Sequence, residues 1–350
     1  MRRRALSIGA TAALALGRPM IRKLLAVAVV VLLAGCGQQG PTTVAATSHP
    51  RSATPTTPST AAPLASPVAA SLSVTDPTGK QLTLERVPER IVCLTGLCDD
   101  LLVELGLVPT ATTTPKLLSR PDYLGESGAK VPVIPGGFGG EDVVEIAQAE
   151  PDLVIGLAGV HDQLRAAVEK FALLWIVEVK SHEDSIAYLR ALAALTGRGA
   201  QQADAENRFR SKLATGLADS RAKGLDDIPV LAMYGGSSVG VNTTDDVLGG
   251  FLSQFFGYPW PSKGGGFETA QAYGIEEILA GAPQVIFVQS FAFGGAKPVS
   301  ETYREHPVWK RIPAVASGKV FEVQPELWAS GRGTRAFGLI LEEALAKAAG

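Results

Sequence analysis

A glycine- and serine-rich stretch carries a pattern that is typical of a nucleophilic enzyme. Residues 236–240 read GSSVG and match the Gly-x-Ser-x-Gly pattern of serine hydrolases, with Ser238 at the position of the nucleophile. That chemistry requires a strand that ends just before the serine and a helix that begins directly after it. A strand is expected before Ser238, but the next helix is expected near Thr244, and the sequence contains no His-Gly-Gly oxyanion loop. We therefore expect the chain not to be an enzyme and keep a serine hydrolase as the less favoured alternative.

Other catalytic and metal-binding patterns are absent from the sequence. It contains no P-loop lysine motif, no dinucleotide fingerprint and no HExxH motif. The four histidines, at positions 49, 161, 182 and 306, do not have the spacing of zinc ligands. A net charge of −2 and a pI near 6.1 give no basic footprint for nucleic acid. We expect a monomer that holds no metal ion or cofactor and binds no nucleic acid.

The thiol of Cys36 is a second candidate for chemistry. The apolar run from Leu24 to Ala34 is shorter than the roughly 20 residues of a membrane span. Two basic residues precede it, so it fits the core of an export signal. Leu-Ala-Gly-Cys, which ends at Cys36, resembles the lipobox of bacterial lipoproteins, in which the cysteine is lipidated and becomes the mature N-terminus. We expect a signal peptide over 1–35 and lipidation of Cys36, with a secretory signal and an incidental cysteine as the alternative.

The start of the chain and the segment after Cys36 differ in composition from the rest. Met20 precedes the apolar run and is a second candidate for the true start, beside a twin-arginine-like extension. Residues 36–71 are dominated by proline, threonine, serine and alanine and have no helical or strand period. Such a segment cannot bury enough apolar surface to offset its ordering entropy. We expect residues 36–71 to be a disordered, lipidated tether.

The next part of the chain alternates between strand and helix. A continuous apolar run, Ile91–Leu94, is typical of a buried parallel strand. The stretch VVEIAQAEPDLVIGL then gives a short helix, a proline and the strand Leu153–Leu157, and LWIVEV gives a further strand. Alternating strands and helices with short connections predict an α/β lobe with a parallel sheet. We assign residues 72–180 to this N-terminal lobe.

A helical segment separates this lobe from the rest. SHEDSIAYLRALAALTG begins with Ser-x-x-Asp, which is close to a capping box, and helical composition continues after the break at Gly197–Gly199. Residues 181–226 carry no strand signal and predict one long helix or two nearly collinear helices. At about 1.5 Å per residue, the second part alone would span about 35 Å, which is the width of a domain. We assign this segment to a linker between two lobes.

The α/β pattern restarts in residues 227–350. IPVLAMYGG and VFEVQPELW are expected strands, and GTRAFGLILEEALAKAAG is an expected C-terminal helix. IEEILAGAPQVIFVQ repeats the scheme of VVEIAQAEPDLVIGL, with Pro283 in the place of Pro151. Two similar Rossmann-like lobes joined by a long helix leave a cleft at the carboxyl ends of their strands, where open α/β sheets place ligands.

These motifs, in this order and behind a lipobox, resemble the helical-backbone class of bacterial solute-binding proteins for ABC importers. The resemblance runs from Leu72 to the C-terminus and rests on the stretches RIVCLTGLCDDLLVELGL, AEPDLVIG, IEEILAGAPQVIFV and HPVWKRIPAVASGKVFEV. It implies a periplasmic or membrane-anchored binding protein that takes part in iron–siderophore, haem or cobalamin transport. The stiff interlobe helix then permits only small lobe movements, and the protein works with a permease and its ATPase at the outer face of the cell membrane. An iron–siderophore is the first expected ligand, haem the second and cobalamin the third.

The resemblance also places candidate ligand residues in the loops after the strands. Aromatic faces suit a macrocycle or a catecholate ring, and a guanidinium pairs with carboxylate or phenolate oxygens. His161 is a candidate haem ligand, although a polar loop histidine is the simpler interpretation. For each aromatic, packing within a half-buried loop is the alternative. The candidate cleft residues are Thr95, Asp99, Phe138, His161, Tyr234, Asn242, Tyr273, Phe291, Phe293, Trp328 and Arg332.

In this family an acidic residue on each lobe docks onto arginines of the permease. Glu276 occupies that position in the C-terminal lobe, and a solvated acid on a helix face is the alternative interpretation. The matching position in the N-terminal lobe is Val144, which departs from the pattern, so Glu145 or Glu141 would have to substitute. We take Glu145 and Glu276 as the expected docking residues.

The remaining cysteines, Cys93 and Cys98, are five residues apart across an expected strand–helix turn. In an exported protein this pair could form a disulfide. Two free buried thiols are the alternative, because the turn restricts the geometry of a bond.

Overall fold

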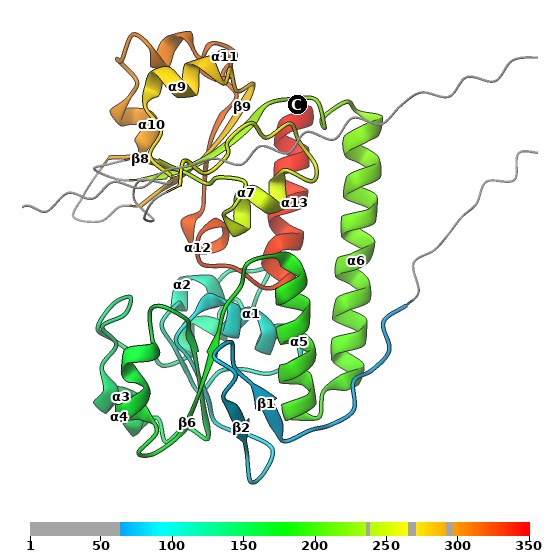
Figure 1. Cartoon of the computed structure of the whole chain (residues 1–350), viewed down its shortest axis with the longest axis vertical. Helices are drawn as coiled ribbons and strands as arrows, with labels where there is room; N and C mark the ends of the chain where they lie inside the picture. Colours follow the sequence, from blue (N-terminus) through cyan, green and yellow to red (C-terminus); the bar gives the residue numbers. More distant parts are fainter. Residues whose placement is uncertain (1–63, 236–238, 265–270, 292–296) are drawn as a thin grey trace, which may run out of the picture. The chain divides into compact units, whose positions relative to one another are not determined.

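The structure is a computed structural model, and it describes residues 64–235, 239–264, 271–291 and 297–350 (Figure 1). The expected signal peptide, Cys36 and most of the expected tether lie outside these residues. Within the described part of the chain, no helix is both long enough and apolar enough to span a membrane.

The first described residues pack against helix α6 of the linker, which spans Gly199–Ala222. The backbone N–H of Ala65 donates to Asn207 Oδ1 at 2.8 Å, and that of Val68 donates to Gln202 Oε1 at 3.2 Å. A Cβ atom on Gly199 would lie 2.3 Å from the carbonyl oxygen of Val68, so the backbones approach closely there. We call residues 64–71 the strap. The expectation that the tether continues to residue 71 is wrong for the strap, because side-chain amides bind its backbone.

The N-terminal lobe contains a four-stranded parallel sheet in the order β4-β3-β5-β6. Its strands are β3 Ile91–Cys93, β4 Ala111–Thr112, β5 Leu153–Leu157 and β6 Leu173–Val177. A separate antiparallel pair, β1 Ser73–Thr75 and β2 Gln81–Thr83, precedes it. The helices of this lobe are α1 Gly96–Glu104, α2 Pro115–Leu118, α3 Val143–Gln148 and α4 Arg165–Val168, with 3-10 turns at Gly128–Lys130 and Asp162–Leu164.

Successive residues of the central strands point into two different cores, because side chains alternate across a sheet. Ile91 and Cys93 pack with α1 in one core, whereas Val92 packs with Ile146 of α3 in the other. Both faces of the sheet are therefore covered, which explains the continuous apolar run. Between β5 and β6 the helical structure consists of the 3-10 turn Asp162–Leu164 and α4.

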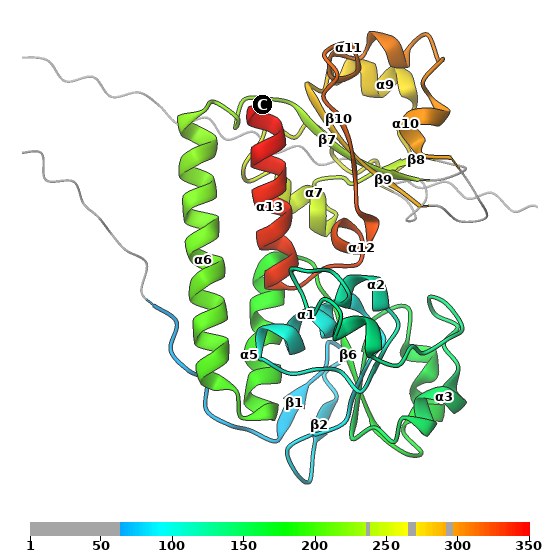
Figure 2. The ribbon, with the colours of Figure 1, turned by 180° about the vertical axis from the view of Figure 1, so that it is seen from behind.

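The helical linker is a hairpin of two helices, and the expectation of one long or two nearly collinear helices is wrong. Helix α5 spans His182–Thr196 and begins with a capping box between Ser181 and Asp184. Gly197 ends it in the left-handed conformation, with φ 66°, and the chain reverses. Helix α6, Gly199–Ala222, then runs back beside α5 and continues beside α13 (Figures 1 and 2). Its 24 residues give a length of about 36 Å.

The C-terminal lobe has a four-stranded sheet in the order β10-β9-β7-β8. Strands β7, β9 and β10 are parallel, and β8 pairs with β7 in the antiparallel sense. The strands are β7 Val230–Gly235, β8 Val239–Val241, β9 Val285–Ser290 and β10 Val320–Val323. The helices are α7 Val247–Leu252, α9 Ile275–Ala280, α10 Val299–Thr302, α11 Pro313–Ala316, α12 Pro325–Trp328 and α13 Thr334–Ala349, with a 3-10 turn at Trp309–Arg311.

The stretch VFEVQPELW is only half strand, which corrects the expectation of one late strand. Strand β10 ends at Val323, and Pro325 begins the short helix α12. Proline favours this first helical position because its fixed φ suits a helix and its missing N–H has no partner to lose there.

The repeated helix–proline–strand scheme is present in both lobes as α3–β5 and α9–β9. Glu150 and Ala282, which precede the two equivalent prolines, have φ values of 46° and 45°. They are the two non-glycine residues with positive φ in the described chain. The repeat therefore extends to an unusual backbone conformation and is not limited to side-chain type.

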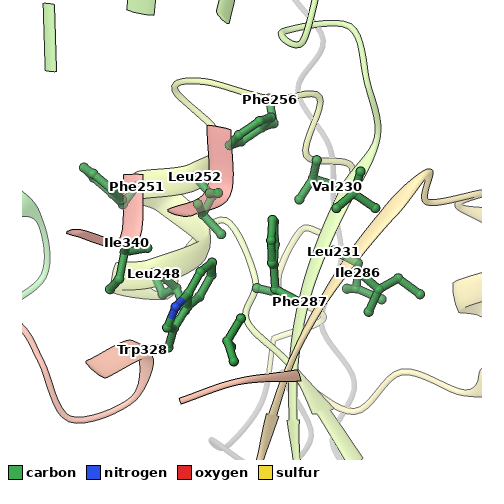
Figure 3. Packing of buried hydrophobic residues seen from close by; sticks show 14 of the residues in the cluster. Val230, Leu231, Leu248, Phe251, Leu252, Phe256, Ile286, Phe287, Trp328 and Ile340 are labelled. Carbon is green, nitrogen blue, oxygen red and sulfur yellow. The ribbon is translucent and has the colours of Figure 1, made fainter. Parts of the chain in front are cut away.

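The largest aromatic side chains of the C-terminal lobe fill its core. The rings of Phe287 and Trp328 have centroids 4.8 Å apart (Figure 3). The ring centroids of Phe251 in α7 and Phe337 in α13 are 4.7 Å apart. All four side chains are at least 99% buried. Helices α7, α12 and α13 thus pack with the sheet of this lobe in one hydrophobic cluster that contains both aromatic pairs.

Candidate functional site

The two lobes meet where the loop formed by residues 329–333, between α12 and α13, lies against the first turns of α1. We call these residues the junction loop. A Cβ atom on Gly96 of α1 would lie 2.4 Å from the carbonyl oxygen of Ser330. The hydroxyl of Ser185 in α5 donates to the carbonyl oxygen of Arg332 at 2.5 Å. The junction loop is therefore held by backbone approach on one side and by a hydrogen bond on the other.

Asp100 of α1 makes the central polar contact of this junction. Its buried carboxylate accepts the backbone N–H groups of Arg335 at 3.1 Å and Ala336 at 2.8 Å, in the first turn of α13. It also accepts the hydroxyl of Tyr123 at 2.7 Å. A carboxylate from the N-terminal lobe thus caps a helix that packs into the core of the C-terminal lobe.

Glu104, one turn along α1, adds a charged contact to the same junction. It forms an ion pair with Arg335, whose Nε lies 3.0 Å from Glu104 Oε1, and it accepts a hydrogen bond from Arg208 Nη2 at 2.7 Å. Arg335 Nη1 also donates to the carbonyl oxygen of Asp122 at 2.9 Å. Helices α1, α6 and α13 are therefore joined by one network of ion pairs and hydrogen bonds.

Two cavities border this network. One, of about 230 Å³, is lined by Glu104, Arg208, Lys212 and Arg335 among others. The second, of about 370 Å³, is lined by Arg120, Gln324 and Glu343 among others. Most of the charged side chains that line them form ion pairs with one another or with neighbouring residues, so the cavities offer little free charge to a ligand.

Several of the expected cleft residues are buried and make local hydrogen bonds. Thr95 caps α1 through the backbone N–H of Leu97. Asp99 accepts the hydroxyls of Thr112, at 2.6 Å, and Thr114, and it is fully buried. The side chain of Asn242 donates to Asp246 at 3.1 Å and accepts from Gln289 at 2.8 Å. These residues position the loops at the strand ends and have little surface of their own.

His161 is buried with both ring nitrogens occupied. Nδ1 accepts the backbone N–H of Leu157 at 2.7 Å, and Nε2 lies 3.0 Å from Glu141 Oε1. Because Nδ1 is an acceptor, the proton must be on Nε2, which donates to Glu141. The expectation that His161 could ligate haem iron is therefore wrong in this structure. Glu141 is buried by the same contact and is not a surface acid.

Trp328 also belongs to the core, and the expectation that its ring covers a ligand is wrong. The ring is fully buried against Phe287, and Nε1 donates to Glu343 at 2.8 Å (Figure 3). The sequence places it in a loop after a strand, but α12 turns its side chain inward.

The remaining described aromatics keep accessible surface. Phe138 is 79% exposed, with its ring edge toward His161. Tyr234, Tyr273 and Phe291 are half-buried on or after the strands of the C-terminal lobe. The hydroxyl of Tyr234 donates to Gln271, and Lys263 lies 4.1 Å above the ring of Tyr273.

Arg332 of the junction loop is half-buried, and its guanidinium is held by carbonyl oxygens. Nη1 donates to the carbonyl oxygens of Trp328 and Gly331, both at 3.0 Å. Burial lowers the pKa of Arg332 from its usual value, and the charge of Asp246 opposes this effect. No carboxylate among the described residues lies within ion-pair distance of Arg332.

Three expected residues lie outside the described part of the chain. They are the lipidation candidate Cys36, the hydrolase candidate Ser238 and the cleft candidate Phe293. The two other cysteines are described, and Cys93 and Cys98 form a disulfide between β3 and α1. Of the two alternatives left open by the sequence, the structure therefore shows the bonded one.

Sequence reasoning missed Asp100 and Gly333. Asp100 stands beside Asp99 in a predicted helix, and nothing in the sequence indicates a partner more than 200 residues away. Gly333 carries a weak signal, because glycine beside a helix start is common where backbone or a foreign side chain must approach closely.

The candidate docking acids lie on equivalent helices of the two lobes. Glu276 is exposed in the first turn of α9, and Glu145 is half-exposed in the first turn of α3. Val144, at the position that matches Glu276, is 63% exposed.

Comparison with known proteins decides the family. A family model described as periplasmic binding protein matches residues 91–327, which is more than half of the chain. The chain belongs to the periplasmic binding protein family. Proteins of this family bind solutes and are not enzymes, in agreement with the sequence expectation.

Individual relatives of this periplasmic binding protein are distant. The Fe(3+)-citrate-binding protein YfmC of Bacillus subtilis is 21% identical over 262 residues, which cover 72% of this chain and 78% of YfmC. The petrobactin-binding protein YclQ of Bacillus subtilis aligns with a TM-score of 0.66 at 18% identity and covers 79% of this chain and 98% of YclQ. Staphylococcus aureus SirA, solved with staphyloferrin B, aligns with a TM-score of 0.63 at 16% identity and the same coverage. These structures share the two-lobe α/β fold with this chain.

The two buried acids of α1 predict a pH dependence of stability. Burial raises the pKa of Asp99 to about 8 and that of Asp100 to about 7, from ordinary values of 3.8. Hydrogen bonds from the hydroxyls of Thr112 and Thr114 lower the pKa of Asp99 and so offset part of the rise. Hydrogen bonds from the hydroxyl of Tyr123 and from the backbone N–H groups of Arg335 and Ala336 do the same for Asp100. A folded-state pKa above the unfolded value gives stability that is complete at low pH and is lost as pH rises through the folded-state pKa.

We therefore expect the contribution of these acids to the free energy of unfolding to fall between about pH 5 and pH 8. Asp99→Asn, which cannot ionise, should reduce this slope when urea unfolding is measured at each pH. Asp152→Asn is the matched control, because the pKa of Asp152 is lowered by backbone N–H groups and Arg86 despite some burial. Equal slopes for wild type and Asp99→Asn would contradict the assignment.

Proposed function

We propose that this periplasmic binding protein is an extracytoplasmic lipoprotein of an ABC importer that captures a ferric siderophore and delivers it to a membrane permease. Family membership supports solute binding, and the relatives YfmC, YclQ and SirA are named for ferric citrate, petrobactin and staphyloferrin B. The sequence expectation of a signal peptide and a lipidated Cys36 supports the location. The tether would give the binding domain reach from the outer face of the membrane.

The observation that carries the ligand class is the unpaired guanidinium of Arg332. Carbonyl oxygens fix its orientation, and no carboxylate among the described residues forms an ion pair with it. A guanidinium in a partly desolvated place pairs strongly with carboxylate oxygens, often with two hydrogen bonds. We therefore favour an anionic ferric chelate that presents carboxylate or phenolate oxygens, such as ferric citrate.

The accessible aromatics complete this proposal. Phe138 from the N-terminal lobe and Tyr234, Tyr273 and Phe291 from the C-terminal lobe would supply apolar faces for the organic part of the chelate. The buried residues Thr95, Asp99 and Asn242 would act indirectly, by holding the loops at the strand ends.

Haem and cobalamin are weaker alternatives. Haem binding would need an iron ligand other than His161, whose two ring nitrogens are occupied. Cobalamin lacks the dense negative charge that would use Arg332. A serine hydrolase is not proposed, because the family consists of binding proteins.

Arg332→Gln should weaken the binding of ferric citrate about 10- to 100-fold, the range for a lost hydrogen bond between charged groups. Tryptophan fluorescence quenching during titration with ferric citrate measures the change. Arg332→Lys keeps the charge but loses the two-pronged geometry, so an intermediate affinity is expected. Unchanged affinity in Arg332→Gln would exclude the role that we assign to this side chain.

For docking, Glu276→Arg should leave the affinity for ferric citrate unchanged and abolish uptake of radioactive iron by whole cells. The physical reason is that a guanidinium at this exposed position repels an arginine of the permease. Glu126→Arg, at another exposed acid, is the charge-matched control and should support normal uptake. If Glu276→Arg loses ligand binding as well, the residue belongs to the ligand site instead.

Cys36→Ala should move the protein from the membrane fraction to the soluble fraction. Acyl chains hold a protein on a bilayer with about 0.8 kcal/mol for each buried CH₂ group, and the variant cannot carry them. Fractionation followed by immunoblotting measures the distribution, with Gln38→Ala as the neighbouring control. Retention of Cys36→Ala in the membrane fraction would argue against lipidation at this residue.

A further inference from the structure

Helix α13 begins without a cap from its own sequence. Gly333 is its N-cap residue and has no side chain, and the first N–H groups of a helix lack intrahelical partners. Two of these groups, on Arg335 and Ala336, are directed at the carboxylate of Asp100 in the other lobe. The cap is therefore supplied by a residue 235 positions earlier in the chain.

The space at this contact leaves no room for a local cap. A Cβ atom on Gly333 would lie 1.9 Å from Asp100 Oδ1, well inside van der Waals distance. Any side chain at position 333 would displace the carboxylate from the helix. Gly333 and Asp100 are thus matched to each other across the two lobes.

Arg332 directly precedes Gly333 in the junction loop. Its carbonyl oxygen accepts the hydroxyl of Ser185, and its guanidinium is held by two carbonyl oxygens of the same loop. The junction loop is therefore fixed by Ser185 at Arg332 and by Asp100 at its end. Loss of the Asp100 contact would release the end of the loop that carries the guanidinium.

We propose that Asp100 is a positioning residue for ligand binding: by capping α13 from the N-terminal lobe, it holds Arg332 in the orientation that receives an anionic ligand. This inference rests on the proposed function, because it assigns Arg332 to the ligand. It adds that the affinity of the C-terminal lobe for an anion depends on a carboxylate of the N-terminal lobe.

The charged groups around Asp100 come from three parts of the chain. Asp99 and Glu104 lie on α1 itself, Tyr123 lies in the loop after α2, and Arg335 lies on α13. Burial is the largest cause of its raised pKa of about 7, and the charge of Glu104 adds to it. Above pH 7, where Asp100 is ionised, its oxygens accept the two N–H groups in stronger, charge-assisted hydrogen bonds, while burial of that charge lowers the free energy of unfolding.

Two variants test the proposal on the full chain, with ferric citrate as the probe. Asp100→Ala removes the cap and should weaken binding about tenfold, the effect of losing one helix cap. Asp100→Asn keeps the shape and should lose affinity at pH 8 but approach the wild-type affinity at pH 5.5, where Asp100 of the wild type is itself neutral. Comparison of the two proteins at each pH removes the effect of pH on the ligand.

A measurement without ligand separates this inference from the proposed function. Hydrogen exchange of the amides of Arg335 and Ala336 should be faster in Asp100→Ala than in the wild type. If wild type binds no ferric citrate but exchange responds in this way, the cap is correct and the proposed ligand is wrong.

The matched control is Asp76→Asn, which removes another buried carboxylate that binds backbone N–H groups, within the N-terminal lobe. It should lower stability without changing the affinity for ferric citrate or its pH profile. Equal loss of affinity in both variants would reduce the role of Asp100 to general stability and overturn the proposal. An Asp100→Asn defect that is the same at pH 8 and pH 5.5 would overturn it as well.

Discussion

The arrangement of the two lobes depends on a buried carboxylate that accepts the first N–H groups of a helix from the other lobe. A buried charge is costly unless donors surround it, and Asp100 receives two backbone N–H groups and a tyrosine hydroxyl. A helix start buried without acceptors is costly too. Each lobe therefore satisfies a requirement of the other, and separation of the lobes would remove the cap of α13 and the two backbone donors of Asp100.

The rest of the junction follows from this contact. Glu104 can bridge Arg208 and Arg335 only because α1 already lies against α13. Helix α6 runs beside α13 and reinforces the same arrangement from the linker. The lobe junction is thus fixed by contacts from α1, α6 and α13 together.

Much of the fold could be predicted from the sequence, since strand runs, proline-terminated helices and the internal repeat are local patterns. The strand Leu153–Leu157 and the helix after Gly333 are found where apolar periodicity indicates them. The hairpin at Gly197 was missed because a glycine break has the same appearance whether the chain continues straight or reverses. Only the packing of α6 against α5 and α13 decides between these outcomes.

The candidate site was predicted less well, because position after a strand does not fix the direction of a side chain. Trp328 and His161 are residue types that suit a ligand, yet Trp328 packs in the core and His161 is hydrogen-bonded to the buried Glu141. Arg332 is available because no acid in the described chain pairs with it, a property of three-dimensional arrangement that sequence spacing does not carry.

The strap has a practical consequence for preparing the protein. Its backbone is bound by Asn207 and Gln202, so the strap is attached to the end of the helical hairpin at which α5 turns into α6. A recombinant fragment trimmed at Leu72 would lose the strap, and the side chains of Asn207 and Gln202 would lose these backbone partners. A fragment for crystallisation should therefore begin upstream of Leu64, so that it retains the strap.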